Sequence, residues 1–177
     1  NMLDWLNKDK VPNELGSREV FGVPFSQFVR LDNEFKIYQN ISKKKSMNYR
    51  LQLGGGLPYG NSQTSLPFDY SFFAGGTNDN RGWRARELGP GGYKYYLDTN
   101  RTATQIGDIR IGASAEYRFN LGSGKLFKGA AFVDAGNVWS LRDDANRPGG
   151  QFTEEWYNQL AVAGGVGLRL DLSFLII

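Results

Sequence analysis

Apolar and polar residues alternate along five long stretches of the chain, residues 28–41, 47–59, 108–120, 126–139 and 160–172. In the first stretch one parity holds Val29, Leu31, Phe35, Ile37 and Ile41, and the other holds Arg30, Asp32, Glu34, Lys36 and Asn40. A period of two is the signature of a β-strand with one apolar and one polar face. No stretch has a convincing helical period, so the sequence predicts an all-β fold.

The lengths of these stretches and of their connections favour one kind of β fold. The stretches are longer than the roughly five or six residues usual in globular proteins, and they reach the ~9–11 residues that a tilted strand needs to cross a bilayer. The connections alternate between short (42–46 and 121–125) and long (60–107 and 140–158). This alternation is typical of a transmembrane up-and-down antiparallel β-barrel, which has tight periplasmic turns and longer outer loops.

A soluble β-sandwich would also bury one face of each strand and wet the other. Two features favour the barrel. Opposite charges recur on the polar parity of successive strands, as on the wall of a polar lumen. The apolar parity carries aromatic residues near strand ends, as in an aromatic girdle: Tyr49, Tyr59, Tyr117 and Trp139. Five strands are fewer than the roughly eight that close the smallest such barrel, so we expect a fragment of a longer protein.

The amino-acid composition excludes several kinds of catalytic and metal-binding site. The chain has no cysteine and no histidine, which removes thiolate chemistry, the usual zinc sites and Ser/His or Cys/His nucleophiles. Most of the familiar enzyme mechanisms are therefore excluded, and we expect no cofactor and no metal. Net charge is +3, and the dense basic run is residues 43–45. One short run is a poor footprint for nucleic acid, so we interpret it as a solvated turn and expect no nucleic-acid partner.

Three motifs, in order and spacing, match one family. The sequence RGW, Arg81 to Trp83, lies within GGTNDNRGWRARELGPG; FVDAGNVW covers residues 132–139; and GVGLR covers residues 165–169. Together they resemble the BamA/TamA-type outer-membrane assembly proteins, the POTRA-barrel superfamily with a bacterial surface antigen domain. The longer form around Arg81 is similar to Bacteroidetes TamL-like members. The resemblance spans essentially residues 24–171.

The resemblance implies a domain organisation. The family barrel has about sixteen strands, and this chain would be a C-terminal barrel fragment holding the tenth to fourteenth. Within a single partial barrel domain, 1–177, the expected parts are an outer loop or lead-in (1–27), a hairpin (28–59), a long lumen-folding extracellular loop (60–107), a hairpin (108–139), an extracellular loop (140–158), and a strand and turn (159–177).

The resemblance also implies a site. In the family this loop folds into the lumen, and its arginine meets acidic residues of the inner wall. The matching residues are Arg81, Glu116 and Asp134, and strand parity independently puts both carboxylates on the polar face. A guanidinium can fork onto a carboxylate through two hydrogen bonds. Gly82 would let the chain turn where a Cβ would clash, and Trp83 would pack on the wall. Neither the motif nor the strand parity assigns a role to Arg84 or Arg86.

The function implied is non-enzymatic assembly or insertion of outer-membrane proteins, or translocation, in the outer membrane of a Gram-negative bacterium. The implied partners are the lipid bilayer, nascent outer-membrane proteins, periplasmic POTRA domains of the full-length chain and accessory envelope proteins. Two alternatives stay open. A passive porin-like channel or transporter would lack a loop-plugged lumen, and a soluble β-sandwich binding module would dissolve without detergent.

Overall fold

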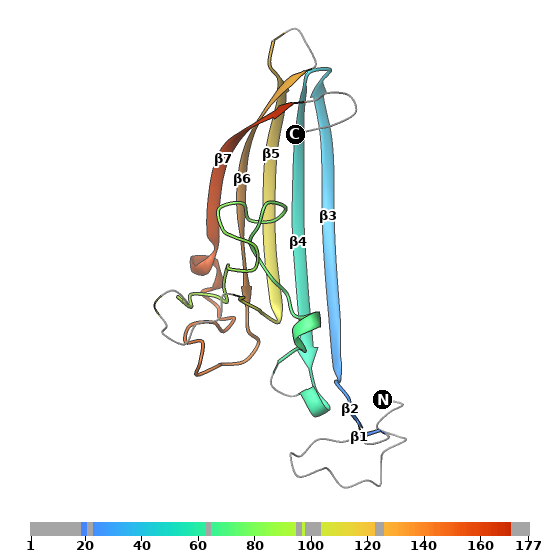
Figure 1. The fold of residues 1–177 in the computed structure, drawn as a ribbon, viewed down its shortest axis with the longest axis vertical. Helices are drawn as coiled ribbons and strands as arrows, with labels where there is room; N and C mark the ends of the chain where they lie inside the picture. Colours follow the sequence, from blue (N-terminus) through green and yellow to red (C-terminus); the bar gives the residue numbers. More distant parts are fainter. Residues whose placement is uncertain are drawn as a thin grey trace.

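Five long strands form one antiparallel sheet in chain order. The computed structural model describes residues 19–20, 23–62, 65–94, 97, 104–122 and 126–170. The sheet strands are β3 (Phe28–Ser42), β4 (Lys45–Pro58), β5 (Ile109–Asn120), β6 (Phe127–Trp139) and β7 (Ala161–Leu170), and a small separate pair is formed by β1 (Glu19–Val20) and β2 (Val23–Pro24) (Figure 1). The predicted all-β class and its five strands are confirmed, with bounds that shift by a few residues.

Two of the predicted parts of the chain are not compared with the structure. Most of the expected lead-in, 1–27, and the expected turn after the last strand, 171–177, lie outside the described residues. Short 3-10 turns occur in the loops at Gly60–Ser62 (η1), Phe68–Tyr70 (η2) and Trp156–Gln159 (η4), which the sequence pattern did not predict. Among the described residues, no helix has the length and apolar character to cross a membrane.

The two faces of the sheet differ as the alternation predicts. On one face large apolar side chains are open, with Val29 62%, Ile37 63% and Val166 87% exposed. No second sheet covers this face within the described part of the chain, whereas a sandwich would bury it. An open apolar face is what a barrel wall presents to lipid.

The assignment of Trp139 to an aromatic girdle was wrong. The parity assigned it to an exposed aromatic girdle, but its side chain is 0% exposed. Its indole Nε1 donates to Oε1 of Gln159 at 2.6 Å, and its ring meets Phe152 and Trp156 edge-on, with centroids 5.5 Å and 6.2 Å away. The loop after β6 therefore covers the end of its own strand. Tyr49 and Tyr59 are exposed on the apolar parity, and Tyr117 is half-buried, stacked on Phe119.

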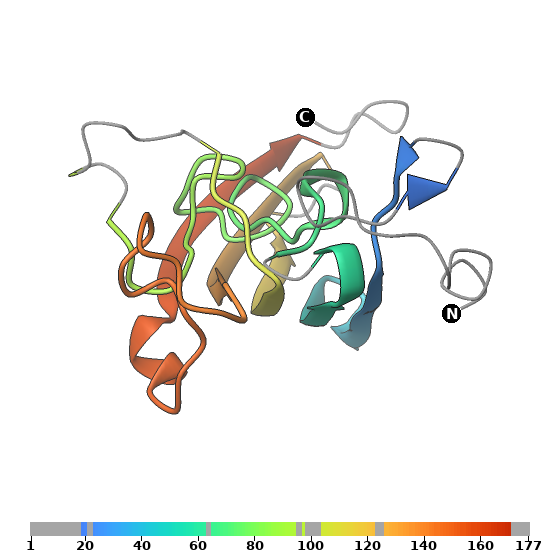
Figure 2. The ribbon, with the colours of Figure 1, turned by 90° about the horizontal axis from the view of Figure 1, so that it is seen from below.

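The long loops and the short turns lie at opposite ends of the sheet (Figure 1). From the loop end, the segment between β4 and β5 folds back over the polar face, as the view along the strands shows (Figure 2). It leaves the β4 end through η1, and Phe72 makes backbone hydrogen bonds with Gly107 where the segment returns to β5. The polar face is therefore covered by its own loop in this part.

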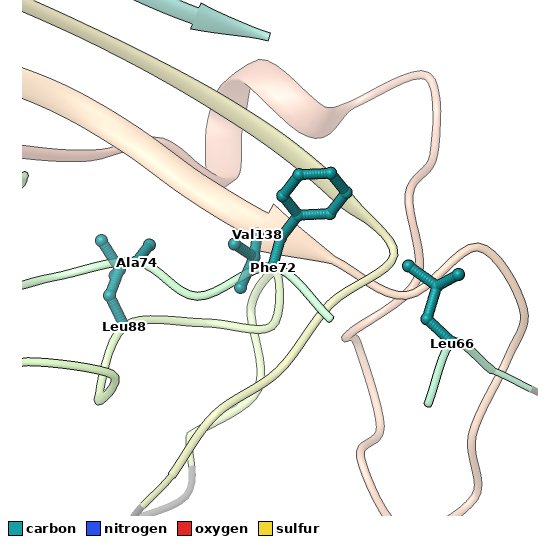
Figure 3. Packing of buried hydrophobic residues seen from close by; sticks show 5 residues of the cluster. All are labelled: Leu66, Phe72, Ala74, Leu88 and Val138. Atoms are coloured by element: carbon teal, nitrogen blue, oxygen red, sulfur yellow. The ribbon is translucent and has the colours of Figure 1, made fainter. Parts of the chain in front are cut away.

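A small apolar core holds this loop to the sheet near its base. The buried cluster comprises Leu66, Phe72, Ala74, Leu88 and Val138 (Figure 3), and only Val138 comes from a strand. Two glycines of β4 make room for it. A Cβ at Gly54 would lie 2.4 Å from the Phe72 ring, and one at Gly56 would lie 2.4 Å from the Leu66 side chain. We call these positions the two glycine sockets of β4.

Asp108, just before β5, joins the two long loops. Its carboxylate accepts a hydrogen bond from the backbone N–H of Leu66, in the first loop, and another from that of Leu141, in the second, each at 3.0 Å. The residue is 3% exposed, so water cannot replace these acceptors without local opening. One carboxylate thus satisfies a backbone donor in each loop.

Replacing Asp108 with alanine is expected to destabilise the folded protein. Each buried N–H left without an acceptor costs about 1–3 kcal/mol. The measurement is the urea midpoint of the protein in lipid, followed by tryptophan fluorescence. Asp69→Ala is the matched control, because Asp69 is exposed on η2. Equal midpoints for the two variants would contradict the bridging role.

Candidate functional site

Arg81, at the tip of the inward-folded loop, lies on Asp134 of β6. Its Nε donates to Oδ2 and its Nη2 to Oδ1, both at 2.8 Å, and its backbone N–H also donates to Oδ2 at 3.1 Å. The two side-chain bonds form a fork that fixes the direction of the guanidinium. The Asp134 side chain is 1% exposed and that of Arg81 20%, so the pair is largely shielded from water.

Glu116 of β5 provides the second carboxylate, and three guanidiniums share it. Nη1 of Arg81 donates to Oε2, while Arg118 and Arg169 donate to Oε1, the latter at 3.2 Å. Glu116 lies beside Asp134 because β5 and β6 pair with Glu116 opposite Phe132 and Ser114 opposite Asp134. Three positive charges therefore face two carboxylates in one cluster.

Phe132 completes the environment of Arg81. The guanidinium carbon lies 3.5 Å from the centroid of the Phe132 ring, a cation–π geometry. The pKa of Arg81 is raised above its ordinary value, mainly by its side-chain hydrogen bonds to Asp134 and further by those to Glu116, against burial, which lowers it. The guanidinium therefore remains charged.

The two residues after Arg81 also touch the sheet or its core. A Cβ on Gly82 would lie 2.6 Å from Cβ of Ala163 on β7, so this glycine is required by the close approach of loop and strand. Trp83 is half-buried and packs against the cluster that contains Phe72 and Val138. All three residues of the RGW motif thus contact the polar face of the sheet or the side chains packed on it.

Further polar contacts fix the loop around Arg81. Asp79 forms an ion pair with Arg110 of β5 at 2.8 Å and accepts the backbone N–H of Gly75. Nδ2 of Asn80 donates to the carbonyl of Ala161 at 2.7 Å. Arg50 of β4 donates to the carbonyls of Asn78 and Asp79. The loop is therefore bonded to four adjacent strands, β4 to β7.

Arg84 and Arg86, the other arginines of the loop, point elsewhere. Both are exposed. The guanidinium of Arg86 lies 4.5 Å from the Phe73 ring centroid, and its backbone has φ of 64°, in the left-handed region that favours glycine. Neither reaches the Glu116 and Asp134 cluster by any ion pair of the described residues.

Several contributors were not singled out from the sequence. Asp79, Asn80, Arg110 and Phe132 all contact the loop or Arg81, and the glycine sockets receive its apolar side chains. Strand parity carried a usable signal for Arg110 and Phe132, which share the polar face with Asp134. No periodicity applies to Asp79 and Asn80, because they lie in an irregular loop.

In the described residues, the charged groups of the site bind one another. Both carboxylates are occupied by guanidiniums, and no cluster of potential ligands in the described ranges could hold a metal ion. What the geometry can do is mechanical, because a charged fork and several backbone contacts hold a loop on one face of a sheet. That the contact does this during the protein's work stays a prediction.

The fold and this contact define a class: the wall of an antiparallel membrane-type β-barrel with an inward-folded loop tied to its polar face. Residues 15–177 match the Omp85 superfamily domain. The chain belongs to the Omp85 superfamily.

Solved structures agree with the fold. The structure is similar to that of BamA from Haemophilus ducreyi lacking POTRA domains 1-3, with a TM-score of 0.64 and 18% sequence identity over 88% of this chain. The chain spans 31% of that protein's chain. A search of curated proteins gave no match. The predicted BamA/TamA-type resemblance is confirmed at this level, and the finer TamL-like likeness stays a prediction.

Proposed function

We propose that this chain is part of a barrel that inserts proteins into the outer membrane of a Gram-negative bacterium or moves them across it, without catalysing a covalent reaction. The observation that carries the proposal is the loop bound to the polar face through Arg81, Asp134 and Glu116. Membership of the Omp85 superfamily supports the same class of function.

The mechanism follows from the two faces of the sheet. The apolar face contacts lipid, and the loop stiffens the wall from the polar side by bonding to four strands. A stiff wall lets strain concentrate elsewhere in the barrel, where a weak seam can offer unpaired strand edges. Such an edge templates an incoming strand by main-chain hydrogen bonds. The substrates are then unfolded outer-membrane proteins, with POTRA domains and accessory envelope proteins as partners.

A passive channel is the second candidate, and the loop argues against it. A porin-like pore needs an open polar lumen, whereas here loop side chains occupy the polar face from Leu66 to Trp83. The same barrel with this loop in place should conduct ions poorly.

The full-length protein in liposomes is expected to speed the folding of a small unfolded outer-membrane barrel, read as the fraction that migrates as folded on unheated gels. Arg81→Ala, which removes the guanidinium from Asp134 and Glu116, should reduce this gain severalfold at equal content of folded protein, while Arg84→Ala should keep it. Planar-bilayer recordings provide the contrasting measurement. Large steady conductance with no gain in substrate folding would replace the assembly function with the channel.

A further inference from the structure

The loop between β4 and β5 has a second side, which faces away from the sheet. Phe72 and Ala74 form backbone bridges and are buried in the core that holds the loop to the sheet. Successive residues of an extended segment point to opposite sides, so Phe73, between them, points away from the sheet. Its ring meets that of Phe68 edge-on at 5.6 Å between centroids, and the guanidinium of Arg86 lies 4.5 Å from its centroid. We call Phe68, Phe73 and Arg86 the Arg86 platform.

The Arg86 platform is open in this chain. Phe68 is 53% exposed, and Arg86 is exposed as well. Aromatic residues and arginine are the residues enriched in the buried part of interfaces. In a closed barrel the polar face of the wall turns inward, and five strands are fewer than the roughly eight that close the smallest barrel. The platform therefore faces a part of the lumen that other strands must close.

The backbone of Arg86 is strained. Its φ is 64°, and it is the third residue of a turn that is closed by a hydrogen bond from the N–H of Glu87 to the carbonyl of Arg84. A residue with positive φ at this position is usually glycine or asparagine. The carbonyl of Arg86 also accepts the N–H of Gln105 at 2.7 Å, which fixes the residue in place. Strain of this kind is concentrated at ligand clamps and other functional sites, so it points to a use for the side chain.

The molecule itself shows what such an arginine binds. Two other arginines among the described residues lie over a phenylalanine ring, and each also donates to a carboxylate: Arg81 lies on Phe132 and binds Asp134, and Arg30 lies on Phe72 and binds Asp32. The ring covers one face of the guanidinium and leaves the N–H groups at its edge to a planar acceptor. Arg86 has the ring, but it makes no ion pair within the described part of the chain.

We propose that Arg86 binds an aspartate or glutamate on the barrel wall that closes the lumen opposite this sheet, while Phe68 and Phe73 pack on apolar side chains beside that carboxylate. Two parallel N–H donors of a guanidinium match the two oxygens of a carboxylate. The loop is then fixed from both sides, by Arg81 on this sheet and by Arg86 on the opposite wall. The proposal requires, as the proposed function does, that the chain is part of a closed barrel, but it does not depend on what that barrel inserts or moves.

The test is photo-cross-linking of the full-length protein in liposomes. p-Benzoylphenylalanine in place of Phe68 keeps an aromatic ring on the platform and leaves Arg86 unchanged. The expected product, mapped by mass spectrometry, is a cross-link within the same polypeptide to a barrel segment outside residues 1–177 that carries an aspartate or glutamate. The same group in place of Tyr157, which is 58% exposed in η4 of the other long loop, is the matched control and should not give this product. Heat-modifiable migration on gels verifies that each variant is folded.

Two substitutions at Arg86 separate the carboxylate from the cation–π contact. Arg86→Gly, which adopts the observed φ without strain, should reduce the yield of the cross-link severalfold. Arg86→Lys keeps a cation over the ring but loses the two parallel donors, so it should lower the urea midpoint of the barrel, whereas Arg84→Lys should not. No substrate protein is present, so the outcome is separate from the test of the assembly function.

Four results would each overturn the proposal: no cross-link from position 68, cross-links confined to residues 1–177, a yield unchanged by Arg86→Gly, or a wild-type urea midpoint in Arg86→Lys. A cross-link to a separate polypeptide would also overturn it, and would assign the Arg86 platform to a partner or substrate protein instead of the opposite wall.

Discussion

Reversing one charge of the Arg81 and Asp134 pair is expected to block folding of the barrel, and reversing both is expected to restore part of it. Asp134→Arg places two guanidiniums in a site where the native carboxylate is 1% exposed. Breaking a buried ion pair from one side costs about 3–5 kcal/mol, because the remaining charge is unpaired. Adding Arg81→Asp re-forms an ion pair of opposite direction, though with Glu116 now close to a like charge. The folded fraction on unheated gels measures both variants.

Removing the guanidinium alone separates folding from loop anchoring. Arg81→Ala is expected to leave the barrel folded and to speed cleavage of the loop by chymotrypsin, whose aromatic sites the substitution does not change. Arg84→Ala is the control, since this exposed arginine lies in the same loop and makes no ion pair among those described. Cleavage rates that are the same for wild type, Arg81→Ala and Arg84→Ala would refute the anchoring role.

Filling a glycine socket should also dislodge the loop, without changing any charge. In Gly54→Val the new side chain would start 2.4 Å from the Phe72 ring, which lies in the buried core. Overpacking of this kind costs roughly 1–3 kcal/mol, and the ring can yield only by moving the loop. The expected result is a lower urea midpoint with an unchanged denaturant slope, together with faster loop proteolysis.

The neighbouring glycine gives a matched control. Gly55 faces the other side of the sheet, and a Cβ there meets no atom within 4 Å. Gly55→Val should therefore keep the wild-type midpoint. Adding Phe72→Ala to Gly54→Val should recover part of the loss by emptying the space that the valine needs. If Gly55→Val were as damaging as Gly54→Val, strand flexibility rather than the socket would explain both.

Strand parity predicted most of what the wall contributes to the site. Period two alone placed Glu116 and Asp134 on the polar face, and the pairing of β5 with β6 puts them in adjacent rows. The resemblance supplied Arg81, and the structure brings these three residues together. Parity could not predict the direction in which the loop folds, because an irregular backbone has no period. Asp79 and Asn80 were therefore missed.

The wrong assignment of Trp139 to the aromatic girdle has a similar cause, since it also depends on how a loop folds. Parity describes which side of a strand a residue faces, but at a strand end a following loop can cover either side. Here η4 and Phe152 enclose the indole, and Gln159 accepts its N–H. A girdle assignment is therefore least secure where a strand runs into a long aromatic-rich loop.

Asp108 couples the two long loops to each other. Since a single carboxylate accepts a backbone N–H from each loop, opening of one removes an acceptor that positions the other. Asn137 adds a second link, because its Nδ2 donates both to the carbonyl of Gly91 and to that of Gln159. The loops should therefore open as one cooperative unit, and their amide protons should exchange with closely similar protection. A molecule that binds loop 140–158 would then also act on the loop between β4 and β5 without touching it.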